Sequence, residues 1–408
     1  MKATNRIMMT ATLGLAASGF AGTNGWDKLV GIFDSTNNAA IPMLDVRTRY
    51  EYGDQDGLEK SNAGTVRARI GLQSQDYSGF SGLVEFEATR AIDTQGYNAL
   101  VMGDPAKTAV VDPENTELNR ISLQYKKGDH QAVVGRQRLI INNARYVGNV
   151  GWRQNEQTYD AAYYKNTTVD GLTAEYAYIE TVQRITGSKA AYDARKWDSN
   201  SHVLNLKYGG IEGHTFSAYA YLLDFENSVA NSSDTVGANY AFKGTVADDY
   251  TLNAYAELAY QKDAADNPAD YDALYLHLTA DVSRDGWSGF AGYELLGSDD
   301  GAGSFRTPLA TGHKFNGWND QFLVTPANGL NDFYAGVGIP VPKVPMKVIY
   351  HHFWADNGSA TYGDEIDYLA VHKINPKTKA IAKASYFIAD SSAYADRFRF
   401  SIEMNYTY

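Results

Sequence analysis

Apolar and polar residues alternate through the last segment of the chain, residues 397–408. One parity is apolar or aromatic and comprises Phe398, Phe400, Ile402, Met404, Tyr406 and Tyr408. The other parity is polar and comprises Arg397, Arg399, Ser401, Glu403, Asn405 and Thr407. Because successive side chains of a strand point to opposite sides, this period of two predicts a β-strand with one apolar and one polar face.

The same alternation recurs from end to end. In residues 44–52 and 65–73 the polar parity carries Arg47, Arg49, Arg67 and Arg69, whereas the other parity is mostly aliphatic or aromatic. The pattern predicts about 18 strands, an even number as expected of an antiparallel membrane barrel. They are expected at residues 44–52, 65–73, 83–89, 118–125, 131–138, 159–165, 172–179, 202–208, 215–223, 235–242, 251–261, 273–281, 287–296, 332–339, 346–355, 365–373, 379–387 and 397–408.

The connections between these segments alternate in length. Short ones are expected at residues 126–130, 167–171, 209–213, 283–286, 340–345 and 375–377, and long ones at 91–117, 139–158, 181–201 and 297–331. Short turns on one rim and long loops on the other are typical of transmembrane antiparallel β-barrels, where the short turns are periplasmic and the long loops extracellular. The final strand, which ends on an aromatic residue, resembles the C-terminal signal of outer-membrane barrels.

The N-terminus has the layout of a secretory signal peptide. Lys2 and Arg6 precede a stretch without charge, residues 7–20, which ends in small residues before Gly22. That stretch is shorter than the roughly 20 residues a spanning helix needs, so a helical membrane protein is excluded. We therefore expect residues 1–21 to be a cleaved signal peptide and residues 22–408 to form a single outer-membrane barrel domain of a Gram-negative bacterium.

The composition agrees with an exported barrel. The chain has no cysteine, 30 tyrosines, 37 glycines and a mean hydropathy of −0.39. Tyrosine suits positions where one end of the ring is wet and the other apolar, as at a membrane interface. The formal net charge of −12 becomes more negative by two when Lys2 and Arg6 are removed, so nucleic acid is not an expected partner. The expected partners are lipid, lipopolysaccharide and a transported solute.

The charged parity is expected to line the inside of the barrel. Alternation alone does not say which parity faces inward, but about 18 strands enclose more space than side chains can fill. An apolar interior would be left hollow, whereas a polar interior can hold water. The lumen is therefore expected to be polar and wet.

Arginines gather on neighbouring strands of this predicted barrel. Closing it places the last strand beside the first, so that one wall carries Arg47, Arg49, Arg67, Arg69, Arg397 and Arg399. Guanidinium groups stay charged and suit carboxylates, sulfates and phosphates, which predicts a basic, pore-lining ladder. The alternative is that each arginine pairs with a nearby acid, because buried charges usually find partners. The acids expected to oppose the ladder are Glu85, Glu87 and Glu403.

The loop at residues 139–158 is the densest candidate site, with Arg145, Arg153, Trp152 and several amides. Loops longer than about 12–15 residues tend to be functional, so we expect this one to fold into the barrel and form the constriction. The string GRQRLIINNARYVGNVGWRQNEQTYDA, which begins at Gly135, resembles the conserved region of the alginate-export family of outer-membrane porins. Residues 315–318 and 329–334 resemble the same family's late loop and re-entry strand.

The resemblance implies an 18-stranded barrel with an arginine-lined constriction that passes an anionic polysaccharide. Carried over position by position, the family pattern implies constriction roles for Arg136, Arg138, Arg145, Trp152, Arg153 and Asp160. No catalytic residue, metal ligand or cofactor is expected.

Three functions remain open at this point. The leading one is a pore for diffusion or export of anionic polar solutes, including a polysaccharide such as alginate. The second is a structural or adhesin barrel with a closed lumen, which holds if all lumenal charges pair and the loops plug it. The third is a hydrolase borne by the barrel, but no serine lies in a nucleophile-type turn, and His202 and His277 have no evident catalytic partners.

Overall fold

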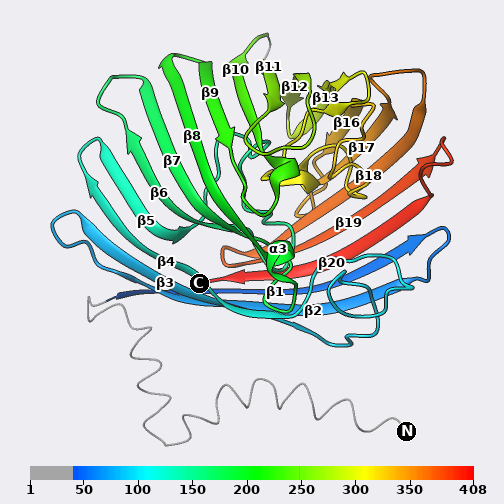
Figure 1. The fold of residues 1–408 in the computed structure, drawn as a ribbon, viewed down its shortest axis with the longest axis horizontal. Coiled ribbons are helices and arrows are strands. Elements are labelled where there is room, and N and C mark those ends of the chain that lie inside the picture. The colour runs from blue at the N-terminus through cyan, green and yellow to red at the C-terminus, as the bar shows by residue number, and fades with distance from the viewer. Residues whose placement is uncertain (1–39, 248) are drawn as a thin grey trace, which may run out of the picture.

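The computed structural model describes residues 40–247 and 249–408. The expected signal peptide, residues 1–21, lies outside the described residues. The described chain forms an 18-stranded antiparallel sheet that closes on itself, because β1 pairs with both β2 and β20. In Figure 1 the blue strand β1 lies beside the red strand β20. No described helix is long and apolar enough to cross a membrane.

The barrel strands follow one another around the barrel in chain order. The first nine are β1 Ala40–Gln55, β2 Ser61–Ser74, β3 Phe80–Ala91, β4 Asn115–Lys127, β5 His130–Gln137, β6 Thr158–Asn166, β7 Leu172–Gln183, β8 Lys196–Ile211 and β9 His214–Leu223. The others are β10 Ser233–Thr245, β11 Thr251–Asp263, β12 Asp272–Arg284, β13 Trp287–Leu296, β16 Leu330–Ile339, β17 Met346–Trp354, β18 Thr361–Asn375, β19 Thr378–Ala389 and β20 Arg397–Thr407. The loops add β14 Ser298–Asp299, β15 Gly303–Ser304, α3 Tyr192–Arg195, η3 Val229–Asn231 and η4 Gly312–Lys314.

All 18 predicted strands are confirmed, and most extend beyond the predicted bounds. The prediction that residues 181–201 form a long loop was wrong, because β7 continues to Gln183 and β8 begins at Lys196. Paired β-hairpin strands can extend beyond the membrane as long as their backbone groups stay paired, which the alternation of side chains alone does not reveal.

The charged parity faces inward, as the size of the barrel predicts. Arg49, Arg67 and Glu87 are buried inside, whereas Ile70 and Phe86 on neighbouring positions are 52% and 57% exposed on the outside. An apolar exterior and a polar interior suit a barrel surrounded by lipid.

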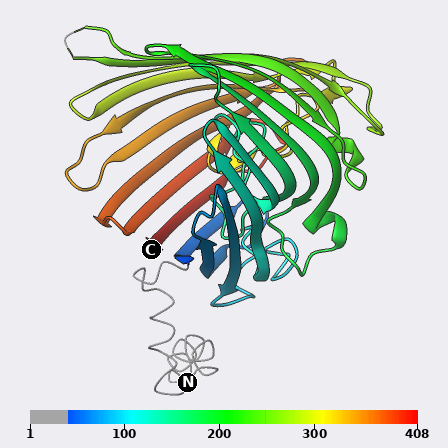
Figure 2. The same cartoon turned by 90° about the vertical axis from the view of Figure 1, so that its left-hand side faces the viewer.

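Three long loops fold back into the lumen: residues 92–114, 138–157 and 297–329. A hydrophobic core forms inside the barrel where they meet its wall. Val147 and Leu309, from two of these loops, are fully buried and pack in one cluster with Tyr159, Tyr219 and Tyr275 of the wall. The yellow segment between β13 and β16 lies within the ring of strands in Figures 1 and 2. The loops therefore fill much of the lumen.

Candidate functional site

The loop at residues 138–157 is bound to the barrel wall at β1. Arg47 donates hydrogen bonds from Nη1 to the carbonyl oxygens of Gly151, Trp152 and Arg153, at 3.2, 3.0 and 3.1 Å. Arg49 donates from Nη2 to the Trp152 carbonyl at 2.5 Å, and its guanidinium lies 4.1 Å above the Trp152 ring. Two arginines of the predicted ladder therefore hold the loop by its backbone.

The same loop also contacts more distant strands. Asn142 donates to Asn205 on β8 at 2.9 Å, and Asn143 donates to the Tyr255 hydroxyl on β11 at 3.4 Å. Arg145 forms an ion pair with Glu294 on β13 at 2.8 Å. The loop thus crosses the lumen from β1 to β13.

Charged side chains from four elements meet around Glu51. Arg153 of the crossing loop and Arg399 of β20 each lie 3.1 Å from the Glu51 carboxylate on β1. Asp320, from the loop between β13 and β16, lies 2.7 Å from Arg153 and 3.5 Å from Arg399. These four side chains are nearly completely buried, so the cluster ties the two loops to the wall rather than facing open water.

A second cluster centres on Glu156 of the crossing loop. Its carboxylate lies 2.6 Å from Arg138 and 3.6 Å from Arg69, and it accepts a hydrogen bond from Asn119 at 2.6 Å. Burial alone would raise the pKa of Glu156, but the two arginines outweigh it and lower the pKa to about 2. Glu156 is therefore an anion that anchors the loop beside β2–β5.

The predicted basic ladder does not face open water. Arg49 pairs with Glu403 at 2.5 Å, Arg67 pairs with Asp45, and Arg69 pairs with Glu87 at 2.5 Å. Arg47 lies 3.9 Å from Glu403, and Arg397 donates to Gln55 and to the carbonyl of Asn319 at 3.1 Å. Most arginines of the predicted ladder are therefore paired with nearby acids, which is the alternative that the sequence left open. Two ladder residues keep partial exposure: Arg397, and Arg47 with 14% of its side chain accessible.

The acids expected to oppose this wall belong to it. Glu403 lies on β20 beside Arg49, Glu87 on β3 beside Arg69, and Glu85 on β3 pairs with Arg120 at 2.7 Å. Strand pairing brings them next to the arginines because alternating positions of adjacent strands share one face. These acids are therefore partners of the wall's arginines and not a separate group that opposes the ladder.

Arg136 and Asp160 do not lie in the constriction, contrary to what the family resemblance implies. They pair with each other at 2.7 Å, and Arg136 lies opposite Ile121 in the register of β4 and β5. Ile121 and Val134 are 49% and 59% exposed on the outer face, and Arg136 shares their parity. The other motif residues, Arg138, Arg145, Trp152 and Arg153, do lie inside the barrel.

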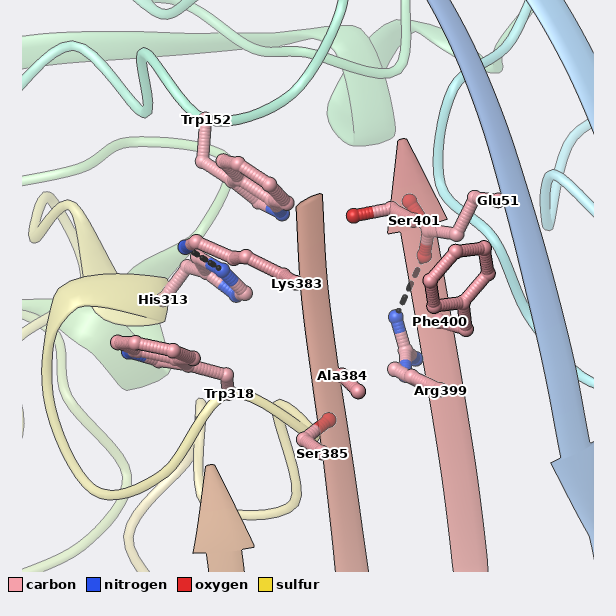
Figure 3. A pocket seen from close by; sticks show the side chains of 10 residues that line it. All are labelled: Glu51, Trp152, His313, Trp318, Lys383, Ala384, Ser385, Arg399, Phe400 and Ser401. Atoms are coloured by element: carbon pink, nitrogen blue, oxygen red, sulfur yellow. Dashed lines mark hydrogen bonds and ion pairs between the residues drawn. The ribbon is translucent and has the colours of Figure 1, made fainter. Parts of the chain in front are cut away.

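Sequence reasoning missed a cluster of Lys383, His313 and Trp318. Lys383 on β19 places its Nζ 3.7 Å from the Trp152 ring centre, 4.4 Å from that of Trp318 and 2.9 Å from His313 Nε2. Figure 3 shows His313 and Lys383 between the two tryptophans, beside a cavity of about 20 Å³ that Ser385 and Ser401 also line. The sequence offered one indication of this cluster, which is that Lys383 lies on the inward parity of β19. The indication was weak because the apolar residues Ile381 and Phe387 share that parity, so the parity is not clearly polar.

The loop at residues 297–329 is also held by carboxylates of β18 and β13. The backbone N–H groups of Trp318 and Asn319 donate to Asp367 at 3.2 Å and to Glu365 at 2.8 Å. The Asn316 side chain donates to Glu294 at 2.6 Å. Among the described residues, no group of three or more acidic or histidine side chains is arranged to hold a metal ion.

Comparisons with known proteins support the fold. No family model matches the sequence, and no curated protein matches it significantly. Solved structures do match it. OccAB4 of Acinetobacter baumannii has a TM-score of 0.70 at 13% identity, covering 91% of this chain and 98% of that chain. OccK9 (OpdG) of Pseudomonas aeruginosa has a TM-score of 0.70 at 14% identity, covering 90% and 98%, and OpdQ of the same organism has 0.68 at 13%, covering 90% and 97%.

These similarities cover nearly the whole described barrel. The apolar exterior and the closed 18-stranded sheet are those of a barrel that spans an outer membrane. The chain is a Gram-negative outer-membrane β-barrel. At such low identity the similarity shows the fold alone, and the names of these structures do not link them to alginate export.

Proposed function

We propose that this barrel is a pore through which small, negatively charged polar solutes cross the outer membrane. The observation that carries the proposal is the difference in exposure between the charged groups around the inward loops. The carboxylates of Glu51, Glu156 and Asp320 are at most 4% exposed, whereas Arg47 and Arg138 keep 14% and 27% of their side chains accessible. Lys314, at the end of η4, is also exposed.

Among the groups at these loop contacts, the accessible charges are therefore cationic although the whole chain is acidic. A solute carboxylate or phosphate that enters meets these guanidinium and ammonium groups. Each such wet contact contributes only roughly 0–1 kcal/mol, which allows a solute to bind and leave quickly, as flux requires.

The pore is tested by planar-bilayer recording with a salt gradient across the membrane. We expect an anion-selective reversal potential that moves toward cations in Arg47→Gln and Arg138→Gln. Arg284→Gln is the matched control, because Arg284 lies at the end of β12 and is 42% exposed beside Asp285. A barrel that inserts and conducts nothing would instead support the closed structural barrel.

Because the sequence resembles the alginate-export family, an anionic polysaccharide is a second candidate solute for this pore. An oligouronate carries a carboxylate on every ring, so it would contact the loop cations repeatedly. Block of the current by oligouronates, but not by single uronic acids, would extend the proposal to an anionic polysaccharide. The filled lumen favours the small solute, because a polymer needs a continuous open path.

A further inference from the structure

His313 is bound on three sides inside the lumen. Its ring stacks on Trp152 with the centroids 4.5 Å apart and the planes at 4°. Nδ1 lies 2.7 Å from the Asp320 carboxylate, and Nε2 lies 2.9 Å from Nζ of Lys383. Figure 3 shows the ring in contact with Lys383 beneath Trp152.

These contacts fix the protonation state of the ring. A lysine ammonium can only donate hydrogen bonds, so Nε2 of His313 must accept, and Nδ1 must carry the proton that is donated to Asp320. A second proton on Nε2 would point at the ammonium and place two positive charges in contact. The arrangement therefore requires neutral His313.

The ring joins three separate elements. Trp152 belongs to the loop at residues 138–157, His313 and Asp320 to the loop at residues 297–329, and Lys383 to β19. Among the described residues no carboxylate lies within ion-pair distance of Lys383, so the His313 nitrogen is its nearest polar partner described. Loss of this contact would remove the hydrogen bond that joins the second loop to β19, while the bonds of Trp318 and Asn319 to β18 remain.

We propose that His313 is a proton-operated latch that releases the loop at residues 297–329 from β19 when the medium becomes acidic. Release widens the passage, so acid raises the open fraction of the channel. The latch rests on the proposed pore function only for its electrical effect, because the loop movement occurs whether or not the barrel conducts.

The charged groups around the ring support this direction. Those facing it are Lys383 from β19, Asp320 from its own loop and Arg153 from the crossing loop, and Arg399 and Glu51 of the wall complete the cluster. Burial lowers the pKa of His313 to about 3; the charge of Lys383 also lowers it, whereas the charge and hydrogen bond of Asp320 raise it. A released histidine regains an ordinary pKa of about 6.5.

The size of the effect follows from this difference. Above about pH 6.5 the ring is neutral in both forms, so protonation of His313 does not change the balance between them. Below that pH the released form binds a proton that the latched form does not, so the ratio of released to latched molecules rises about tenfold for each pH unit until about pH 3.

The electrical test compares channels between pH 7.5 and pH 4.5. We expect the ratio of open to closed time in the wild type to rise about tenfold per unit below pH 6.5. His313→Gln keeps an acceptor for Lys383 but cannot be protonated, so it should lose this response. His202→Gln is the control, because His202 bonds to Tyr176 on the outer face, and it should keep the response. A response that survives in His313→Gln overturns the latch.

A chemical test reads the loop movement without conductance. The chain has no cysteine, so Ser385→Cys, in the cavity beside Lys383, introduces a single buried thiol. Its labelling by a thiol reagent active in acid, relative to Ser392→Cys in an exposed loop, should rise about tenfold per pH unit below 6.5. A constant ratio contradicts the latch. Labelling that rises in a barrel that never conducts would refute the pore and leave the latch standing.

Discussion

Nε of Arg145 in the crossing loop lies 2.8 Å from Oε1 of Glu294 on β13, and both side chains are at most 3% exposed. The same loop is held at β1 by the arginine bonds to the Trp152 carbonyl. The loop is therefore attached to the barrel wall at two separate places, β13 and β1. It cannot leave the lumen without breaking these buried charge contacts.

Removing one partner of this buried pair should destabilise the protein strongly. Glu294→Gln leaves the Arg145 guanidinium buried without its counter-ion, which typically costs about 3–5 kcal/mol. Denaturant unfolding in detergent micelles measures this change. Lys189→Gln is the control, because Lys189 pairs with Glu114 while 53% exposed, and its loss should cost less than about 1 kcal/mol. Equal changes in the two variants would show that Arg145 is not buried as described.

Arg47 and Arg67 should differ although they face each other across β1 and β2. Arg47 is partly accessible, so Arg47→Gln should shift ion preference toward cations, and the loss of its bonds to the loop should lower stability less than Arg67→Gln does. Arg67 has a fully buried side chain paired with Asp45, so Arg67→Gln should lower the unfolding free energy and change selectivity little. Reversal potentials and unfolding curves of both variants check this. A shift in selectivity as large for Arg67 would return it to the pore surface.

The strands and their orientation were predictable from the sequence because they depend on local alternation and on the number of strands. Residues 397–408 show this best, since each inward position is polar and each outward position apolar. The inward direction followed from the space that about 18 strands enclose. Neither inference needs knowledge of which distant residues touch.

The contacts of the site could not be predicted in the same way. Arg153 contacts Glu51 and Asp320 only because two long loops fold back into the lumen. The spacing of residues in the sequence does not indicate that these loops come close together. Arg136 was assigned to the constriction by resemblance, but adjacent Val133 and Val134 hid the parity of β5. The cluster at Lys383 was missed because its partners lie on other elements.

The anchor at Glu156 should weaken in acid. Its folded pKa of about 2 lies below the ordinary value of about 4.3, so its contribution is fully present above pH 4.3 and is lost as the pH falls toward 2. At roughly 1.4 kcal/mol per pKa unit, the contribution is on the order of 3 kcal/mol. The unfolding free energy of Glu156→Gln should therefore lie below that of the wild type at pH 7, and the difference should shrink between pH 4.5 and pH 2. A constant difference over this range would mean that the ion pairs contribute nothing.

Replacing residues 142–154 by a short Gly–Ser linker should open the lumen. The segment contains Arg145, Trp152 and Arg153, which hold the loop to β13, β1 and the Glu51 cluster. Without them the wall retains its paired strands, because every barrel strand bonds to two neighbours independently of the loop. Single-channel conductance should then rise, and any block by oligouronates should disappear with the cations that bind them.

The control replaces residues 264–270, in the short loop between β11 and β12, and should leave conductance unchanged. An unchanged conductance in the first variant would place the constriction elsewhere, with the loop at residues 297–329 as the remaining barrier.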